Sequence, residues 1–332
     1  MAKLKVALYW GASCGGCEIA VLEIGEKILD FAAVADIVFW PVAVDFKYHD
    51  VEQMPDKYID LCLYNGAIRT SENLEIAQLL RAKSKVLAAF GACACFGGIP
   101  ALANQTDRSG VFRRAYFDAP SVSNQSGTLP RAVTDTPHGE LELPAFYNTV
   151  VALRDVVDVE YFVPGCPPVA DQIWAVIEAV VTGQLPAPGS VVGAGEKTVC
   201  DECPREKQEK KIKRFVRPHE IIPEPNTCLL EQGIVCLGPA TRAGCKARCI
   251  EANMPCRGCY GPPAGVVDQG AKMLSALASV IDSQDPDEIA EIVGQIADPL
   301  GTFYRFGLSN SLLKRVRLPA PEEPAAELGA AG

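Results

Sequence analysis

Cysteine is the residue type through which this sequence could most plainly do chemistry. The chain has 332 residues and 14 cysteines, and two glycines separate Cys14 from Cys17 in the stretch GASCGGCEIA. A pair with this spacing fits a redox-active disulfide, half of a zinc site or half of an iron-sulfur site. Because a reducing cytosol disfavours structural disulfides and a chain of this length does not need them, we expect the thiols to bind metal.

Four cysteines come shortly after predicted strands: Cys14, Cys17, Cys93 and Cys166. The carboxyl ends of parallel strands lie at one edge of a sheet, so these thiols should converge there. Four thiolates fit a tetrahedral zinc ion or a 4Fe-4S cluster, whereas a thioredoxin-like pair would leave two of them unexplained. Neighbouring glycines let the backbone approach closely and leave amides free for sulfide, which favours the cluster.

The elements that would position these thiols alternate between β-rich runs and helical patterns. Strands are predicted at residues 5–10, 36–40, 59–64, 85–90 and 159–163, and helices at 18–30, 71–83 with Ser71 as N-cap, and 169–181. This alternation predicts an α/β fold with a parallel sheet of flavodoxin-like or Rossmann-like type. Residues 101–144 break the pattern and are too long for an ordinary connection, so we expect an excursion that serves a partner surface.

Composition changes after Gly183, where a proline- and glycine-rich linker is predicted at 185–195. Eight cysteines follow: Cys200, Cys203, Cys228, Cys236, Cys245, Cys249, Cys256 and Cys259. Large apolar residues are sparse here, so cofactors are expected to take the place of a core, with helices near 265–281 and 286–296. The predicted domains are residues 1–184, a flavodoxin-like domain; 185–317, a mostly irregular and helical cysteine-rich domain; and 318–332, a disordered tail.

These eight cysteines make two further sets of four, so the sequence predicts three clusters. Their spacing differs from the cysteine run of bacterial ferredoxins. Two zinc ribbons remain possible on spacing alone, and spacing does not decide how the eight divide into fours.

Other residues are open to more than one interpretation. Cys62 lies mid-strand and is expected to be a core thiol, while Cys95 could exchange roles with Cys93, which we take as the ligand. Glu18 could tune the first site, contact a partner, or be a carboxylate favoured by a helix N-terminus. The basic run 207–214 could dock an acidic partner or be a solvated face, and the histidines are too isolated to assign.

Charge and hydropathy narrow the class of protein. A net charge of −10 argues against a nucleic-acid binder. No apolar run approaches the roughly 18 residues needed to span a bilayer, and no secretory or twin-arginine signal is evident at the start. We therefore expect a cytoplasmic protein without a membrane span.

The motifs and their order resemble the small, electron-transferring subunit of nickel-iron hydrogenases. The likeness rests on CGGCE after the first strand, GACA followed by two glycines, GCPP, and the cysteine-rich C-terminal part, and it extends from about residue 5 to 313. It implies three 4Fe-4S clusters: a proximal one on Cys14, Cys17, Cys93 and Cys166; a distal one on Cys200, Cys203, Cys228 and Cys236; and a medial one on Cys245, Cys249, Cys256 and Cys259.

Two positions depart from the periplasmic members of that family. Cys200 stands where they have histidine, and Cys249 where they have proline. A complete 4Fe-4S medial cluster and low potentials at all three sites are therefore implied. The nearest resemblance is to methyl-viologen-reducing hydrogenases, which pass electrons to heterodisulfide reductase and not to the deazaflavin coenzyme.

The resemblance implies an electron relay with no catalytic residues of its own. Its partners would be a large subunit with the nickel-iron centre, a small iron-sulfur adaptor subunit and heterodisulfide reductase subunits. Two alternatives are an electron-transfer subunit of the related quinone-linked dehydrogenase complex, and a zinc-stabilised interaction protein without a redox role.

Overall fold

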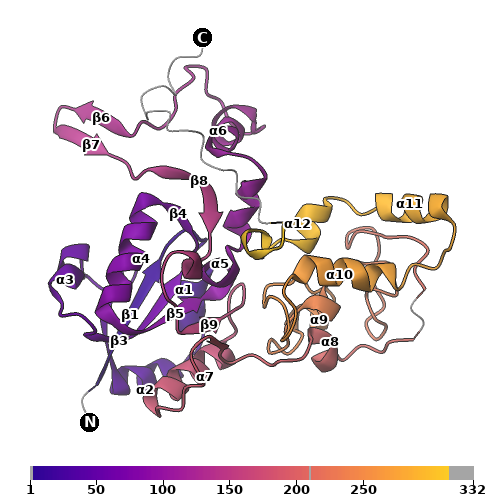
Figure 1. Ribbon diagram of the computed structural model, residues 1–332, viewed down its shortest axis with the longest axis horizontal. Helices are drawn as coiled ribbons and strands as arrows, with labels where there is room; N and C mark the ends of the chain where they lie inside the picture. The colour runs from indigo at the N-terminus through magenta and orange to yellow at the C-terminus, as the bar shows by residue number, and fades with distance from the viewer. Residues whose placement is uncertain (1–2, 209–210, 314–332) are drawn as a thin grey trace.

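A six-stranded parallel sheet lies at the centre of the N-terminal part of the molecule (Figure 1). The computed structural model describes residues 3–208 and 211–313. From one edge to the other the strands are β2 (Ala35–Phe39), β1 (Leu4–Trp10), β3 (Ile59–Asn65), β5 (Ser84–Phe90), β9 (Tyr161–Val163) and β10 (Ser190–Val191). This is the flavodoxin-like order, in which the second strand precedes the first. The predicted fold class is confirmed.

Helices cover both faces of this sheet. One face carries α1 (Gly16–Leu22), α2 (Lys27–Val34) and α7 (Ala170–Val181), and the other carries α3 (Tyr48–Gln53), α4 (Ser71–Lys83) and α5 (Gly91–Phe96). Side chains alternate between the two faces: Val6 and Leu8 pack with the first group, Ala7 and Tyr9 with the second. The sheet is thus held between two apolar layers, which fix the points where the loops leave its strands.

Two helices differ in detail from the prediction. The single helix predicted at 18–30 is α1 followed by α2, because Gly25 adopts a φ of 66° in the turn between them. Helix α4 has the predicted bounds, but its N-cap is Thr70, whose hydroxyl accepts a hydrogen bond from the Asn73 N–H at 3.2 Å. Ser71 already lies within the helix, and its hydroxyl accepts from the Ala145 N–H at 2.9 Å.

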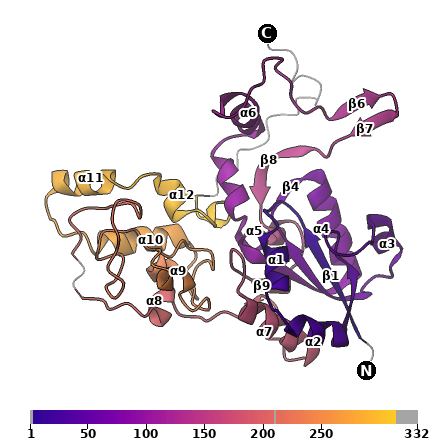
Figure 2. The ribbon, with the colours of Figure 1, turned by 180° about the vertical axis from the view of Figure 1, so that it is seen from behind.

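The segment after α5 departs from the sheet, as predicted. It forms η1 (Ile99–Gln105), α6 (Arg108–Arg113), η2 (Arg114–Asp118) and the hairpin β6 (Val133–Thr136) and β7 (Gly139–Glu142), then returns through β8 (Phe146–Val151) and η3 (Leu153–Asp155). β8 pairs antiparallel with β4 (Ile68–Thr70). Figures 1 and 2 both place the hairpin away from the sheet and from the C-terminal part. That this segment forms a surface for a partner stays a prediction.

The C-terminal part is made of short helices and long loops, and it has an apolar core of its own. The helices are α8 (Val199–Glu202), η4 (Gly238–Ala240), α9 (Arg248–Glu251), α10 (Gln269–Ala278), α11 (Pro286–Gly294), α12 (Pro299–Phe303) and η5 (Leu308–Asn310). Phe215, Ile234, Met273 and Leu308 belong to one buried cluster. The expectation that cofactors take the place of a core is therefore wrong, because apolar residues far apart in sequence meet in the fold.

Buried polar contacts join the two parts of the chain. The Tyr260 hydroxyl donates to Gln172 Oε1 at 2.7 Å, and the Ser309 hydroxyl donates to the Phe96 carbonyl at 2.9 Å. The predicted linker 185–195 includes β10, which extends the sheet, and the division at residue 184 stays a prediction. The predicted tail at 318–332 lies outside the described residues. No helix in the described ranges is both long enough and apolar enough to cross a membrane.

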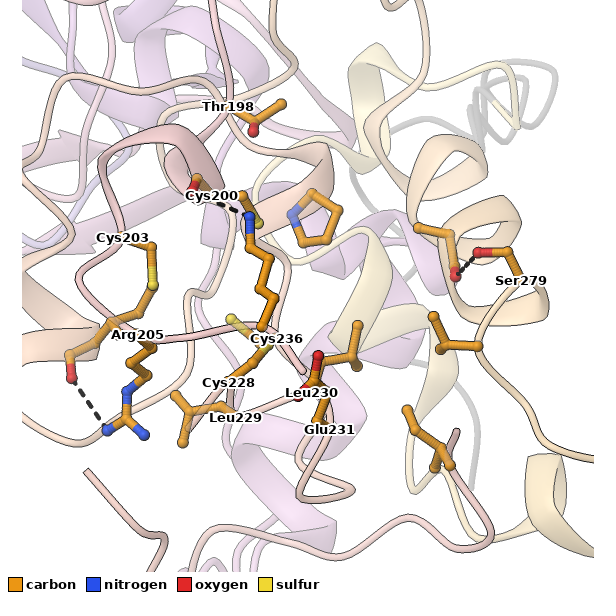
Figure 3. A pocket seen from close by; sticks show the side chains of 16 residues that line it. Thr198, Cys200, Cys203, Arg205, Cys228, Leu229, Leu230, Glu231, Cys236 and Ser279 are labelled. Carbon is orange, nitrogen blue, oxygen red and sulfur yellow. Dashed lines mark hydrogen bonds between the residues drawn. The ribbon is translucent and has the colours of Figure 1, made fainter. Parts of the chain in front are cut away.

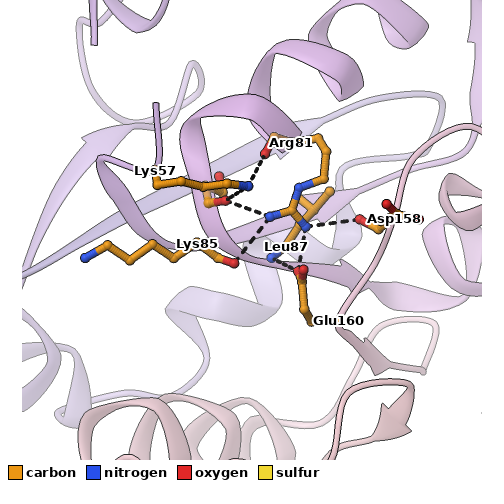
Figure 4. Close-up of polar contacts among 7 residues, drawn as sticks. Lys57, Arg81, Lys85, Leu87, Asp158 and Glu160 are labelled. Atoms are coloured by element: carbon orange, nitrogen blue, oxygen red, sulfur yellow. Dashed lines mark hydrogen bonds and ion pairs between the residues drawn. The ribbon is translucent and has the colours of Figure 1, made fainter. Parts of the chain in front are cut away.

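Arg81 of α4 joins three segments at the amino end of the sheet (Figure 4). Its guanidinium donates to Glu160 Oε2 at 2.6 Å, to the Asp158 carbonyl at 3.1 Å and to the Ser84 carbonyl at 2.6 Å. Glu160 Oε2 also accepts from the Leu87 N–H at 2.7 Å. The Arg81 and Glu160 side chains are only 15% and 27% exposed, so water screens this pair weakly.

We expect Arg81→Ala to lower the free energy of unfolding by about 1–3 kcal/mol, because partly buried acceptors lose a charged donor. Urea denaturation of the chain measures this. Arg113→Ala is the control, since the pair between Arg113 and Asp118 is 77% and 46% exposed and should contribute less than about 1 kcal/mol. Equal effects of the two substitutions would contradict this account of Arg81.

Candidate metal centres

Three loops at the carboxyl edge of the sheet bring the first four cysteines together. Cys14 lies between β1 and α1, Cys17 lies in α1, Cys93 lies in α5 after β5, and Cys166 follows β9. Burial raises the pKa of Cys93 to about 12, and the charges of Cys166 and Cys14 act in the same direction. Burial likewise raises the pKa of Cys17, with added contributions from Cys93, Cys166 and Cys14. Each thiol therefore lies in the electrostatic field of the others.

Two glycines leave room for these sulfurs. A Cβ atom on Gly91, where φ is 86°, would lie 2.4 Å from Cys17 Sγ, and one on Gly98, where φ is 57°, would lie 2.6 Å from Cys93 Sγ. Both distances are far below van der Waals contact, and both backbone conformations favour glycine. The backbone thus approaches the thiols more closely than any other residue type would allow.

Glu18 lies in the first turn of α1, as predicted, but its side chain is only 5% exposed. The indole Nε1–H of Trp40 donates to its carboxylate. Burial raises the pKa of Glu18, which the hydrogen bond from Trp40 opposes. The position of Glu18 in the first turn of α1 agrees with the interpretation of a carboxylate favoured by the helix N-terminus, and the buried hydrogen bond from Trp40 is a contact that the sequence did not predict.

A second group of four cysteines lines a cavity of about 260 Å³ in the C-terminal part (Figure 3). Its members are Cys200, Cys203, Cys228 and Cys236. Burial raises the pKa of Cys200 to about 11 and that of Cys236 to about 12. A Cβ atom on Gly238 would lie 3.0 Å from Cys200 Sγ, so glycine again leaves space beside a thiol.

The remaining four cysteines form a third group: Cys245, Cys249, Cys256 and Cys259. Burial raises the pKa of Cys259 to about 12, and the charges of Cys245 and Cys249 contribute to this rise. Burial also raises the pKa of Cys256, with a contribution from Cys259. Cys259 is thus the member that lies near the three others.

This third group lies between the other two. The backbone N–H of Cys256 donates to Cys236 Sγ of the second group at 3.3 Å. On the other side, the backbone of Cys166, from the first group, is a hydrogen-bonding partner of the Cys259 thiol. Adjacent contacts therefore connect all three groups in the order first, third, second.

The two cysteines left over belong to the protein core. Cys62 is fully buried in the middle of β3, as expected of a core thiol. Cys95 is also fully buried, and its thiol donates to the Ala89 carbonyl at 3.2 Å. The histidines of the chain are exposed. Within residues 3–208 and 211–313, no three His, Cys, Asp or Glu side chains are grouped as a preformed site for a single metal ion.

Sequence reasoning missed two polar residues beside the cysteines. Arg205 is 6% exposed and lines the cavity of the second group. Glu202 contacts the third group, where its carboxylate accepts from Cys245 Sγ at 3.5 Å and from the Gly244 N–H at 3.0 Å. Each residue lies close to a cysteine in the sequence, but only the fold of distant loops gives it these contacts.

The chain is similar to one protein family over about half of its length and to hydrogenase subunits over most of it. Residues 14–180 match the family described as NADH ubiquinone oxidoreductase, 20 Kd subunit. The chain is 38% identical to the iron-sulfur subunit of the F420-non-reducing hydrogenase of Archaeoglobus profundus, over 94% of this chain and 98% of the relative. It is also 38% identical to an F420-non-reducing hydrogenase subunit of Methanothermobacter marburgensis, over 94% and 96% of the two chains.

A solved structure, that of the H2-activated [NiFeSe]-hydrogenase of Dm. baculatum, shares the fold. It matches 80% of this chain and 96% of its own chain, with a TM-score of 0.51 and 20% identity. The chain therefore belongs to the family of hydrogenase small subunits, and within it to the small subunits of F420-non-reducing hydrogenases. It is an oxidoreductase subunit without the catalytic centre, and the predicted family is confirmed.

Proposed function

We propose that this chain carries electrons between a nickel-iron large subunit and a redox partner through three 4Fe-4S clusters. The proximal cluster would be held by Cys14, Cys17, Cys93 and Cys166; the medial one by Cys245, Cys249, Cys256 and Cys259; and the distal one by Cys200, Cys203, Cys228 and Cys236. The observation that carries this proposal is the pair of contacts that connect the three groups: Cys166 with Cys259, and Cys256 with Cys236 at 3.3 Å.

The residues present fit such clusters. Thiols whose pKa is raised by burial become thiolates only beside a strong positive charge, which iron ions supply. The glycines beside Cys17, Cys93 and Cys200 let the backbone pack closely against these thiols, and the second group lines a cavity of about 260 Å³. When bound, a 4Fe-4S cluster accepts and releases one electron at a time. The polypeptide fixes the relative positions of the three groups through the contacts of Cys166 with Cys259 and of Cys256 with Cys236.

The proposed partners lie at the two ends of this relay. Next to Cys17, Ile19 and Leu22 of α1 are 60% and 55% exposed, and such apolar side chains beside the proximal group suit the large subunit. At the distal end the proposed recipients are a small iron-sulfur adaptor and heterodisulfide reductase subunits, in line with relatives named F420-non-reducing hydrogenases. Free thiols in every described cysteine suit the reducing cytoplasm, where we place the complex.

Metal and sulfide analysis tests the clusters. We expect protein purified without oxygen to contain about 12 iron and about 12 acid-labile sulfide per chain, as three 4Fe-4S clusters require. Zinc without sulfide would instead support a zinc-stabilised protein without a redox role. Iron and sulfide near one third of these amounts would restrict the proposal to a single cluster.

Co-purification tests the partner. An affinity tag on this chain, expressed in its own cell, should recover a nickel-containing subunit that evolves or oxidises hydrogen. A recovered complex that lacks nickel and reduces quinones would favour the quinone-linked alternative. We expect the double substitution Ile19→Asp and Leu22→Asp to reduce recovery of nickel, because buried charges disfavour an apolar interface.

A further inference from the structure

Arg205 is a buried cation in the wall of the distal cavity. Its Nη1 donates to the carbonyls of Glu224 and Thr227 at 2.6 and 2.8 Å. Its Nη2 donates to the Ile250 carbonyl at 3.5 Å and to the side-chain oxygen of Asn253. All four acceptors are uncharged, so the positive charge has no counter-charge in these contacts. Figure 3 shows the side chain beside Cys203 at one wall of the cavity.

One N–H donor of this guanidinium, at Nε, makes no hydrogen bond within the described residues. The Nε–H of Arg205 is buried and has no hydrogen-bond partner within the described part of the chain. The four hydrogen bonds from Nη1 and Nη2 fix the plane of the guanidinium. The group therefore cannot rotate to bring its Nε–H to another acceptor. A buried donor without an acceptor is rare in folded proteins and calls for a missing partner. Because Arg205 lines the cavity, a group bound in the cavity can supply that acceptor.

Lys207 adds a second positive charge to the same cavity. It lines the cavity, and its Nζ donates to the Cys200 carbonyl at 3.2 Å. The charge of Lys207 lowers the pKa of the Cys200 thiol, against the larger effect of burial. Unlike Arg205, Lys207 is exposed, so solvent screens its charge more strongly. The cavity wall therefore presents one buried and one exposed cation beside one carboxylate, that of Glu231, whose Oε2 accepts a hydrogen bond from the Gln208 N–H at 2.9 Å.

We infer that the Nε–H of Arg205 donates to a sulfur of the cluster held by Cys200, Cys203, Cys228 and Cys236, and that Arg205 and Lys207 together raise the reduction potential of that cluster. The inference rests on the proposed function. Reduction adds one negative charge, and a nearby cation with a hydrogen bond to sulfur stabilises the reduced state more than the oxidised one. When an electron moves from the medial to the distal site, the first is oxidised and the second reduced by one electron, with no proton transferred.

The potential of the distal cluster affects the direction in which electrons move along the relay. Four thiolate ligands, with Cys200 in place of a histidine, favour a low potential at the distal site. The two cations oppose this effect in the distal cavity. Electrons are therefore retained longer at the end of the relay that faces the redox partner.

The test uses the whole anaerobic complex and a potentiometric titration followed by electron paramagnetic resonance. Arg205→Gln should shift the midpoint potential of one cluster to a more negative value and leave the other two unchanged. Arg205→Lys, which keeps the charge but has no Nε–H, should give a smaller shift in the same direction. Lys207→Gln should also give a smaller shift, and Arg217→Gln, which removes an exposed cation that does not line the cavity, should give none.

A spectroscopic readout separates this role from a structural one. In the wild-type complex with ¹⁵N-labelled arginine, the reduced distal cluster should show a hyperfine coupling to an arginine nitrogen. Lys207→Gln should keep this coupling and Arg205→Lys should remove it. If Arg205 only ties loops together, the wild-type coupling is absent, and that result overturns the inference even if the variants lose the cluster. Wild-type protein with eight iron or fewer would instead overturn the proposed three clusters.

Discussion

Replacing Cys17 by serine should reduce hydrogen-dependent reduction of methyl viologen by more than about 100-fold. Loss of a group that merely supports a metal ligand already costs about 10- to 100-fold, and Cys17 is itself a proposed ligand. Its side chain is buried, and its thiol lies in the field of Cys93, Cys166 and Cys14. The measurement is the dye-reduction rate of the assembled complex, normalised to its nickel content.

Cys95→Ser is the matched control for that experiment. Cys95 is buried like Cys17, but its thiol donates to the Ala89 carbonyl, a bond that a serine hydroxyl can replace. We therefore expect the Cys95→Ser complex to keep most of its dye-reduction rate. Full activity in Cys17→Ser, or equal losses in both variants, would contradict the ligand assignment of the proximal group.

Local signals predicted most of the sheet domain. The apolar runs of β1, β3 and β5 are buried between two layers of helices, so their sequences report strand and burial together. The prediction of a single helix over 18–30 was wrong because the apolar periodicity continues across Gly25, whose positive φ breaks the helix. Strand β10 was missed because two residues carry no pattern, and only pairing with β9 makes them a strand.

The candidate site was predictable where topology decides it. A parallel sheet places its strand ends at one edge, so Cys93 and Cys166 could be brought to Cys14 and Cys17 from sequence alone. The eight later cysteines lie in the short helices α8 and α9 and in loops that fold back on each other, and spacing does not predict that Cys256 contacts Cys236.

The position of Arg205 depends on the same folding back of distant loops. Its acceptors lie 19 to 48 residues further along the chain, where no local pattern points to them. Neighbouring cysteines in the sequence mark the region as a metal site. They do not reveal which cation enters the cavity wall.

Gly91→Ala should cost the complex about four iron per chain, the content of one 4Fe-4S cluster. A methyl group at this position would lie 2.4 Å from Cys17 Sγ, so either the thiol or the start of α5 must move. Because α5 also carries Cys93, either movement separates two proposed proximal ligands. Iron analysis and the loss of one cluster signal on reduction measure the effect.

Backbone strain at a positive φ would not by itself cause the loss of iron. The variant Gly189→Ala separates this strain from the clash with Cys17 Sγ. Gly189 has a φ of 90°, close to the 86° of Gly91, but a Cβ atom there would meet no atom within 4 Å. Both substitutions should therefore cost about 1–2 kcal/mol of backbone strain, whereas only Gly91→Ala should lose iron. A Gly91→Ala complex with all of its iron would mean that Cys17 does not bind a cluster from its position in α1, and that the proximal group must be assigned again.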